Sequence, residues 1–302
     1  MRAMTAPRHF DRELMGLRRL RAARTEPADF LLRHVAEDLA DRLDLVQRDF
    51  RAIVDLGSPT DAIRAALAAR GRPMAIGTEV VPALAARRAA PVVAAHADML
   101  PFAAGSLDLV VSGLALQLVD DLPGVFVQVR RALKPDGLFL AAMLGGDTLT
   151  ELRQSFAEAE SEVDGGLSPR VAPFADVRDI GGLLQRAGFA LPVTDSDRLT
   201  VRYADVFALM RDLRAMGATN PLADRIRRPL KRATLLRMAA IYHERFADPD
   251  GRIRATFQIV TLSGWAPHES QQQPLKPGSA KARLADALKA VELSTGEKPS
   301  GS

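Results

Sequence analysis

Short apolar runs alternate with amphipathic segments between residues 52 and 144 of the chain. The apolar runs have the length of buried strands and lie at 52–56, 73–76, 92–95, 107–112 and 138–144. Helical periodicity marks 62–70 and 122–133, and the sequence KPDG at 134–137 is expected to stop the second helix and turn the chain. Strands separated by helices are typical of βαβ units, so we predict five parallel strands.

The region before residue 52 is predicted to be helical, and the region after residue 144 is predicted to contain both helices and strands. Residues 30–45 are amphipathic, 145–189 read as helix and loop, and later strands are expected at 199–203 and 255–262. Further helices are expected at 204–217 and 230–246, and 280–293 has a helical pattern. We predict an α/β, doubly wound, mostly parallel sheet with helices on both faces. Its predicted parts are a helical segment at 1–50, a core domain at 51–268 with helical insertions at 145–190 and 204–247, and a flexible tail at 269–302.

Composition narrows the classes of function. The chain has 302 residues, of which 47% are hydrophobic and 26% are charged, as in a globular protein with a sizeable core. It contains no cysteine, which excludes thiol catalysis, disulfides and thiolate metal sites. No apolar run approaches the roughly 20 residues that span a bilayer, and no apolar secretory signal is expected at the N-terminus. We therefore expect a cytoplasmic protein.

Polar residues and glycines follow the predicted strands, where open α/β sheets bind ligands. Asp55 and Gly57 follow the first strand, Glu79 the second and Asp98 the third. The sequences ADMLPF at 97–102, LDLV at 107–110 and LKPDGL at 133–138 complete the pattern. Together they resemble the class I S-adenosylmethionine (SAM)-dependent methyltransferases. The resemblance implies a SAM site in which Glu79 holds the ribose, Asp98 and its neighbour Met99 lie at the adenine, and the loop after Asp55 approaches the cofactor.

The loop after the first strand departs from that pattern. Residues 55–61 read DLGSPTD, whereas the superfamily pattern would be DLGxGxG. Proline fixes φ and removes an N–H donor, and a carboxylate at Asp61 would repel the carboxylate of SAM. Ser58, Pro59 and Asp61 suit a helix start as N-cap, first and third helical positions, so a capping box is the structural alternative. Thr78 is a second candidate for the position at which the superfamily has its ribose-binding aspartate, in which case Glu79 lies one residue after that position.

Longer motifs point to a narrower family. They read FDR at 10–12, GGDTLTELR at 145–153, GGLSPRVAPF at 165–174, MRDLRAMG at 210–217 and GWAPHESQ at 264–271. In this order they resemble the respiratory complex I assembly factor 5 family and its alphaproteobacterial relatives. The resemblance implies a complex I subunit as partner and peripheral contact with the inner membrane. It leaves open a methyltransferase, an arginine hydroxylase, a non-catalytic assembly module, or an O-methyltransferase for a small acid or carrier protein.

Few other residues suggest chemistry. Asp147 either positions a substrate cation or, like its neighbour Thr148, caps the following helix, and His268 is a second candidate for a catalytic role. The five histidines are scattered without the spacing of a metal site, so no metal is predicted. A basic cluster at 225–237 lacks the interleaved aromatics of nucleic-acid sites, which favours a solvated face or a contact with a partner protein or anionic membrane over nucleic acid.

Overall fold

The computed structural model describes residues 8–73, 75–88 and 91–271. The chain divides into two compact units, Met1–Pro267 and His268–Ser302, and the second is described only over residues 268–271. In the described part of the chain, no helix is long and apolar enough to cross a membrane. The predicted tail at 269–302 and the helical pattern at 280–293 lie almost entirely outside the described residues.

Seven strands form one sheet in the order β3-β2-β1-β4-β5-β7-β6. The strands are β1 (Ile53–Asp55), β2 (Ile76–Glu79), β3 (Val92–Ala94), β4 (Leu107–Gly113), β5 (Leu133–Leu144), β6 (Ala190–Tyr203) and β7 (Ile253–Trp265). The first five strands pair with one another in parallel, as predicted, whereas β7 pairs antiparallel with both β5 and β6. The strand order reverses between β1 and β4, which places the ligand-binding crevice of such folds at their carboxyl ends.

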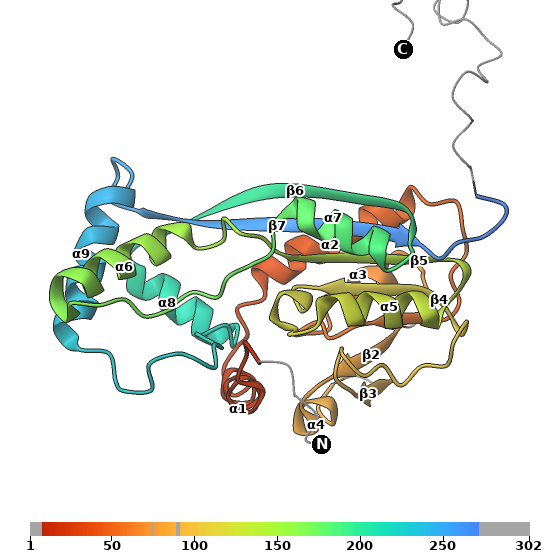
Figure 1. Ribbon diagram of the computed structural model, residues 1–302, viewed down its shortest axis with the longest axis horizontal. Helices are drawn as coiled ribbons and strands as arrows, with labels where there is room; N and C mark the ends of the chain where they lie inside the picture. The colour runs from red at the N-terminus through yellow and green to blue at the C-terminus, as the bar shows by residue number, and fades with distance from the viewer. Residues whose placement is uncertain (1–7, 74, 89–90, 272–302) are drawn as a thin grey trace, which may run out of the picture. The chain divides into compact units, whose positions relative to one another are not determined.

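Side chains of the central strands point alternately to the two faces of the sheet, and both faces are covered (Figure 1). One face packs against α2 (Phe30–Asp44) and α3 (Ala62–Ala69), and near the extended ends of β6 and β7 against α6 (Thr150–Asp164), α8 (Val206–Ala215) and α9 (Arg232–Phe246). The other packs against α5 (Leu122–Ala132) and α7 (Val177–Arg186). The prediction of helices on both faces is therefore confirmed.

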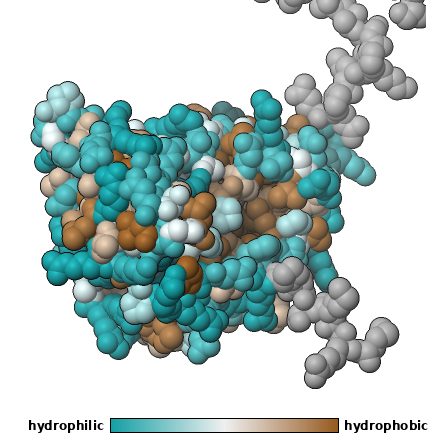
Figure 2. Space-filling view, turned by 60° about the vertical axis from the view of Figure 1, so that its left-hand side comes forward, coloured by the Kyte–Doolittle hydropathy of each residue, from teal (hydrophilic) through white to brown (hydrophobic). Residues whose placement is uncertain are grey.

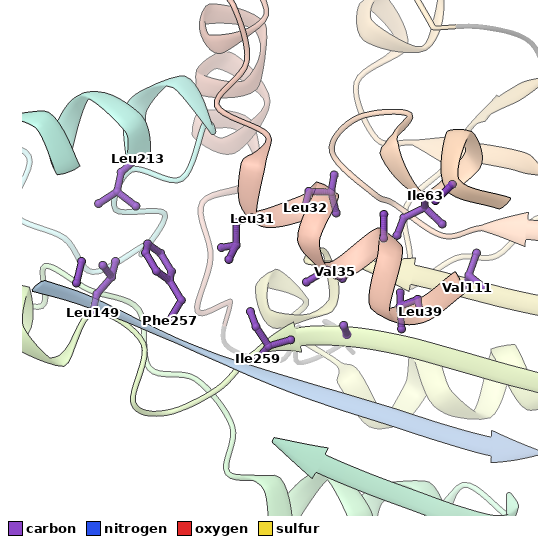
Figure 3. Close-up of a cluster of buried hydrophobic side chains, with 14 of the residues drawn as sticks. Leu31, Leu32, Val35, Leu39, Ile63, Val111, Leu149, Leu213, Phe257 and Ile259 are labelled. Atoms are coloured by element: carbon purple, nitrogen blue, oxygen red, sulfur yellow. The ribbon is translucent and has the colours of Figure 1, made fainter. Parts of the chain in front are cut away.

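The core on the first face is continuous from α2 to the far end of β7. Figure 3 shows Leu31, Val35 and Leu39 of α2 pointing toward Val111 of β4 and Ile259 of β7. These α2 side chains recur at helical spacing, as the amphipathic pattern predicted, and at most 3% of each is exposed. The helix is thus an integral part of the sheet's packing.

The remaining helices are short or peripheral. Helix α1 (Arg12–Ala22) and α4 (Pro82–Ala85) lie near the β2 and β3 edge, and the 3-10 turn η1 (Leu116–Leu118) follows β4 (Figure 1). Polar side chains occupy much of the surface in the view of Figure 2, with apolar side chains in patches between them. No side chain of α1 is fully buried, so polar contacts hold this helix in place more than apolar packing does.

Two local predictions were wrong. The second strand covers Ile76–Glu79 instead of 73–76, because parallel pairing with β1 and β3 selects the more polar stretch. Helix α5 ends at Ala132, just before the KPDG segment, as expected, but this segment forms an irregular stretch of β5, which begins at Leu133, instead of a separate turn. A register shift between Leu107 and Leu109 accommodates this segment, and Asp136 adopts a positive φ of 61°.

Phe139 of β5 should be a major source of stability. Its ring lies 5.6 Å from Phe126 and 5.6 Å from Phe189, and it is fully buried. We expect Phe139→Ala to lower the free energy of unfolding by about 3–5 kcal/mol, measured by urea denaturation. Val127→Ala, on the exposed side of α5, is the control and should cost less than about 0.5 kcal/mol. A loss below about 1 kcal/mol for Phe139→Ala would contradict this packing.

Candidate functional site

The carboxyl ends of the parallel strands bring the predicted cofactor residues to one edge of the sheet. Asp55 is the last residue of β1 and Glu79 the last of β2, while Asp98 lies in the turn that follows β3. Parallel pairing of β1 with β2 and of β2 with β3 makes these positions neighbours. Glu79 therefore stands at the end of β2 itself.

The loop after β1 is tied into the fold through its backbone and one serine. Gly57 adopts a φ of 72°, which favours glycine, and its N–H donates to Thr78 Oγ1 over 2.8 Å. Ser58 is fully buried; its hydroxyl donates to Asp55 and accepts from the N–H of Gly113 over 3.0 Å. Thr78 is thus a partner of the loop, which accounts for its burial without a ligand.

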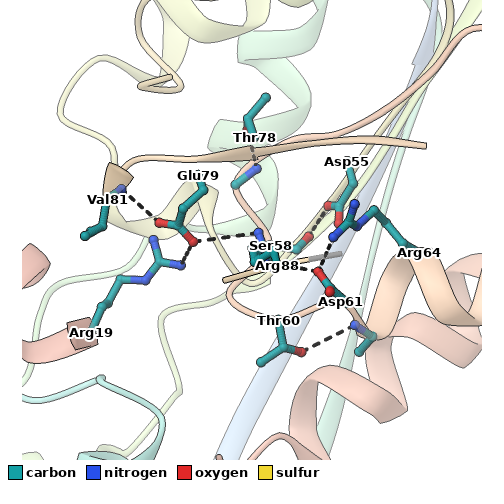
Figure 4. Close-up of polar contacts among 12 residues, drawn as sticks. Arg19, Asp55, Ser58, Thr60, Asp61, Arg64, Thr78, Glu79, Val81 and Arg88 are labelled. Carbon is teal, nitrogen blue, oxygen red and sulfur yellow. Dashed lines mark hydrogen bonds and ion pairs between the residues drawn. The ribbon is translucent and has the colours of Figure 1, made fainter. Parts of the chain in front are cut away.

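The predicted capping box is wrong. Helix α3 begins at Ala62, its N-cap is Asp61, and no side chain caps it. Instead, the carboxylate of Asp61 forms ion pairs with Arg64 and with Arg88, the latter at 3.1 Å (Figure 4). Arg88 also donates to the carbonyl oxygen of Ser58 over 2.7 Å. The loop is therefore closed by arginines and not by a helix start, because Asp61 is more strongly attracted to cations than to the N–H groups of α3.

Glu79, like Asp55, is almost completely enclosed. Only 1% of its side chain is exposed. One of its carboxylate oxygens accepts from the N–H of Val81 over 3.0 Å, and the other accepts from Arg19 of α1 over 2.7 Å. Arg88 lies 3.7 Å from that second oxygen (Figure 4). A buried carboxylate requires such compensation, and this one is satisfied entirely by the chain itself.

Asp98, like Glu79, contacts an arginine of α1. Arg12 of α1 donates to Asp98 and lies 3.4 Å from Asp120, which in turn accepts from the N–H groups of His9 and Phe10. The carbonyl of Asp98 accepts from Gln128 of α5 over 2.8 Å, which fixes the turn. The neighbouring side chain of Met99 is 75% exposed, so it makes no pocket wall in this conformation.

Asp55 lies beneath the loop and forms no ion pair within the part of the chain that the structure describes. Its side chain is 1% exposed, Ser58 donates to one carboxylate oxygen, and the other oxygen has no hydrogen-bond partner. Burial raises the pKa of Asp55 from 3.8 to about 6, and the Ser58 hydrogen bond only partly opposes this shift. This acid therefore carries its charge at a free-energy cost at neutral pH.

The candidate catalytic residues Asp147 and His268 contact residues other than these acids. Asp147 follows β5 and pairs with Arg198 of β6, while Thr148 exchanges hydrogen bonds with the backbone of Gln258. Neither caps α6, whose N-cap is Leu149 with a φ of 55° and no side-chain bond, so the capping alternative is wrong. In the second unit, His268 Nδ1 lies 2.6 Å from the hydroxyl of Ser270, a local contact.

The basic cluster is partly neutralised. Arg225 pairs with Asp11, Lys231 with Asp164 and Arg237 with Glu162. The side chains of Arg227, Arg228 and Arg232 form no ion pair within the described residues. No group of three histidine, aspartate or glutamate side chains in the described ranges could hold a metal ion.

The acids suit SAM by type and position, but not in this conformation. A ribose would need access to Glu79, which is enclosed, and an adenine amine would meet Asp98 already engaged by Arg12. The loop offers few free N–H groups because Pro59 has none and Gly57 donates to Thr78. With the side chains in these positions, the site therefore does not fit SAM.

The sequence analysis did not predict the arginines that occupy the site. Arg19 and Arg12 lie 60 and 86 positions from their partners Glu79 and Asp98.

This fold and its strand-end acids define a protein of the class I methyltransferase superfamily, and comparisons agree. A Methyltransferase domain family model matches residues 54–141. The YcgJ protein from Bacillus subtilis shares the fold with a TM-score of 0.51 at 14% identity, covering 78% of this chain and 99% of that one. Human arginine-hydroxylase NDUFAF5 is 40% identical over 97% of this chain and 88% of its own. The chain therefore belongs to the respiratory complex I assembly factor 5 family.

A second group of relatives carries a different name. The malonyl-[acyl-carrier protein] O-methyltransferase from Laribacter hongkongensis is 38% identical over 85% of this chain and 90% of its own. The sequence is therefore similar to proteins named for two different activities, arginine hydroxylation and methyl transfer to a carrier-protein substrate.

Replacing Asp55 should reveal its raised pKa. Because the folded-state pKa of about 6 exceeds the ordinary 3.8, the folded state loses stability as pH rises between these values. We expect Asp55→Asn to be more stable than wild type by about 1–3 kcal/mol above pH ~6.5, and the difference to vanish below pH ~4. Urea denaturation across this pH range measures both.

Asp250→Asn provides the opposite control. The Asp250 carboxylate accepts hydrogen bonds from Arg202 and from the N–H of Arg252, which lower the pKa of Asp250. That variant should be the less stable one at neutral pH, with the difference disappearing in acid. If Asp55→Asn is instead destabilising at neutral pH, the charged form of Asp55 contributes favourably and its described environment is wrong.

Proposed function

We propose that this protein acts in the assembly of respiratory complex I by binding one of its subunits, with the methyltransferase fold serving mainly as a scaffold. Family membership supports the assembly role. The scaffold role rests on the contacts at the carboxyl ends of β1, β2 and β3, which we call the cofactor edge. There Arg19 pairs with Glu79 and Arg12 pairs with Asp98. SAM would bind weakly at such an edge.

The proposed partner surface is the segment that contains Arg227 and Arg228. Both side chains are exposed and lack ion pairs among the described residues, and Ile226 beside them is 36% exposed. Unpaired cations around an apolar residue suit an acidic protein surface, where their charge speeds the encounter and sets orientation. Such a partner would be met in the cytoplasm or at the inner membrane surface.

A carrier-protein O-methyltransferase is the second candidate function. It is favoured by the similarity to the malonyl-[acyl-carrier protein] enzyme. Methyl transfer requires a bound methyl donor, whereas scaffolding does not. Affinity for SAM therefore separates the two candidates.

The loop at 57–61 should weaken SAM binding to the high micromolar range or beyond. Loss of a few backbone contacts at roughly 1 kcal/mol each is sufficient for this. Calorimetry on the purified full chain should show weak binding for wild type and several-fold tighter binding for Pro59→Gly with Asp61→Gly. Thr60→Gly, in the same loop but outside the glycine pattern, is the matched control and should leave the affinity unchanged. Sub-micromolar binding by wild type would contradict the scaffold role.

Deleting the gene should lower the amount of assembled complex I in the host, quantified on native gels. We expect rescue by the wild-type gene and by Asp55→Ala with Asp98→Ala, since scaffolding needs no cofactor. Arg227→Glu with Arg228→Glu should fail to rescue, whereas Arg178→Glu with Arg186→Glu, an exposed pair on α7, should succeed.

Two results would overturn parts of this proposal. Normal complex I in the uncomplemented deletion strain would remove the assembly role. Failure of a folded Asp55→Ala, Asp98→Ala variant to rescue would instead require an active cofactor site, which the scaffold role excludes.

A further inference from the structure

Helix α1 presents two arginines to two different acids of the cofactor edge. Arg12 and Arg19 are seven residues apart, which is about two helical turns, so they lie on the same side of α1. Arg19 reaches Glu79 at the end of β2, and Arg12 reaches Asp98 after β3. One helix therefore occupies both positions at which the adenosyl part of a cofactor would be bound.

These contacts close the edge. Arg19 is 18% exposed and Glu79 only 1%, so nothing outside the chain can reach the carboxylate while the pair is formed. The side chain of Arg12 pairs with Asp98, which is 22% exposed, and also lies 3.4 Å from Asp120. Gly16, between the two arginines on α1, faces Val81, the residue that opens the turn after β2; a Cβ placed on Gly16 would lie 3.6 Å from the Val81 side chain. The helix thus lies directly against the strand end that an adenosyl ligand must contact.

The start of α1 and its Arg18 are attached to the segment between α8 and α9. Phe10 forms a β-bridge with Leu222, and the N–H of Asp11 donates to Pro221 over 2.8 Å. Arg18 donates to the carbonyl of Thr219 over 3.0 Å, and Asp11 pairs with Arg225 at 2.9 Å. A movement of the 219–225 segment would therefore be transmitted to α1.

We propose that α1 is a latch over the cofactor edge, and that Arg12 and Arg19 decide whether the edge admits an adenosyl ligand. The latched form binds SAM weakly because both ion pairs must break first. Release of α1 exposes Glu79 and Asp98 together, since both arginines belong to one rigid helix. This inference goes beyond the assembly role and does not depend on it.

The first test removes both arginines. Calorimetry with SAM on the full chain should show at least about tenfold tighter binding for Arg12→Met with Arg19→Met than for wild type. Methionine keeps the apolar stem length and helix propensity while removing the charge. Arg21→Met is the matched control, because Arg21 lies exposed on α1 without an ion pair among the described residues, and it should bind SAM as wild type does. Unchanged or weaker binding by the double variant would overturn the latch.

The second test holds the latch closed without relying on the arginines. The chain has no cysteine, so Gly16→Cys with Val81→Cys adds a single possible disulfide between α1 and the turn after β2. In the Arg12→Met, Arg19→Met background, the oxidised protein should bind SAM at least about tenfold more weakly than the reduced protein. Equal affinity in the two redox states would show that the edge is open to SAM with α1 in place, and the proposal would fail.

These outcomes separate the latch from the proposed function. If the deletion strain has normal complex I but the engineered disulfide still controls the affinity for SAM, only the assembly role is wrong. If the deletion strain loses complex I but neither the arginine substitutions nor the disulfide changes SAM binding, only the latch is wrong. A thermal unfolding curve for each variant distinguishes an opened edge from an unfolded protein.

Discussion

The compensation of Glu79 is the constraint on which the rest of the site depends. A carboxylate that is 1% exposed at the end of a buried strand must be neutralised, and the chain does this with Arg19 and, at longer range, Arg88. Those two arginines connect Glu79 to α1 and to the loop after β1, because Arg19 belongs to α1 and Arg88 also holds Asp61 and the Ser58 carbonyl. The edge therefore forms one network of charges, and its parts are expected to move together.

This network gives a physical account of the altered glycine loop. Where the superfamily pattern has glycines that approach a ligand, this chain has a proline and an acid, and the acid is used internally. A loop that finds its partners within the fold has less need of a ligand for stability. Asp55 is the exception, since one of its oxygens has no partner and its burial raises its pKa. Among these acids, Asp55 is therefore the one whose charge is opposed by burial.

The chain is similar to proteins named for two different activities, and the structure gives a reason why one fold can serve both. The sheet and its two cores do not involve the edge residues, so they persist whatever the edge binds. The motif at 145–153 makes backbone contacts with β7, such as Thr148 with Gln258, and the motif at 165–174 contacts Glu160 of α6 through Ser168 and Arg170. Function in this family is therefore expected to depend on the state of α1 and the loop more than on the core.

The sequence by itself determined the alternation of strands and helices, the parallel direction of the first five strands and the amphipathic α2, because these follow from local periodicity and from helices that connect consecutive strands. It also placed Asp55, Glu79 and Asp98 at one edge. Only the tertiary structure decided what these acids contact. Arg12 and Arg19 precede their partners by 86 and 60 residues, so no local pattern predicts the pairing. Contacts that the local pattern did not predict also explain why the capping box is wrong. The spacing of Asp61 from Ser58 suited a capping box, but in the structure Asp61 forms ion pairs with Arg88 and Arg64.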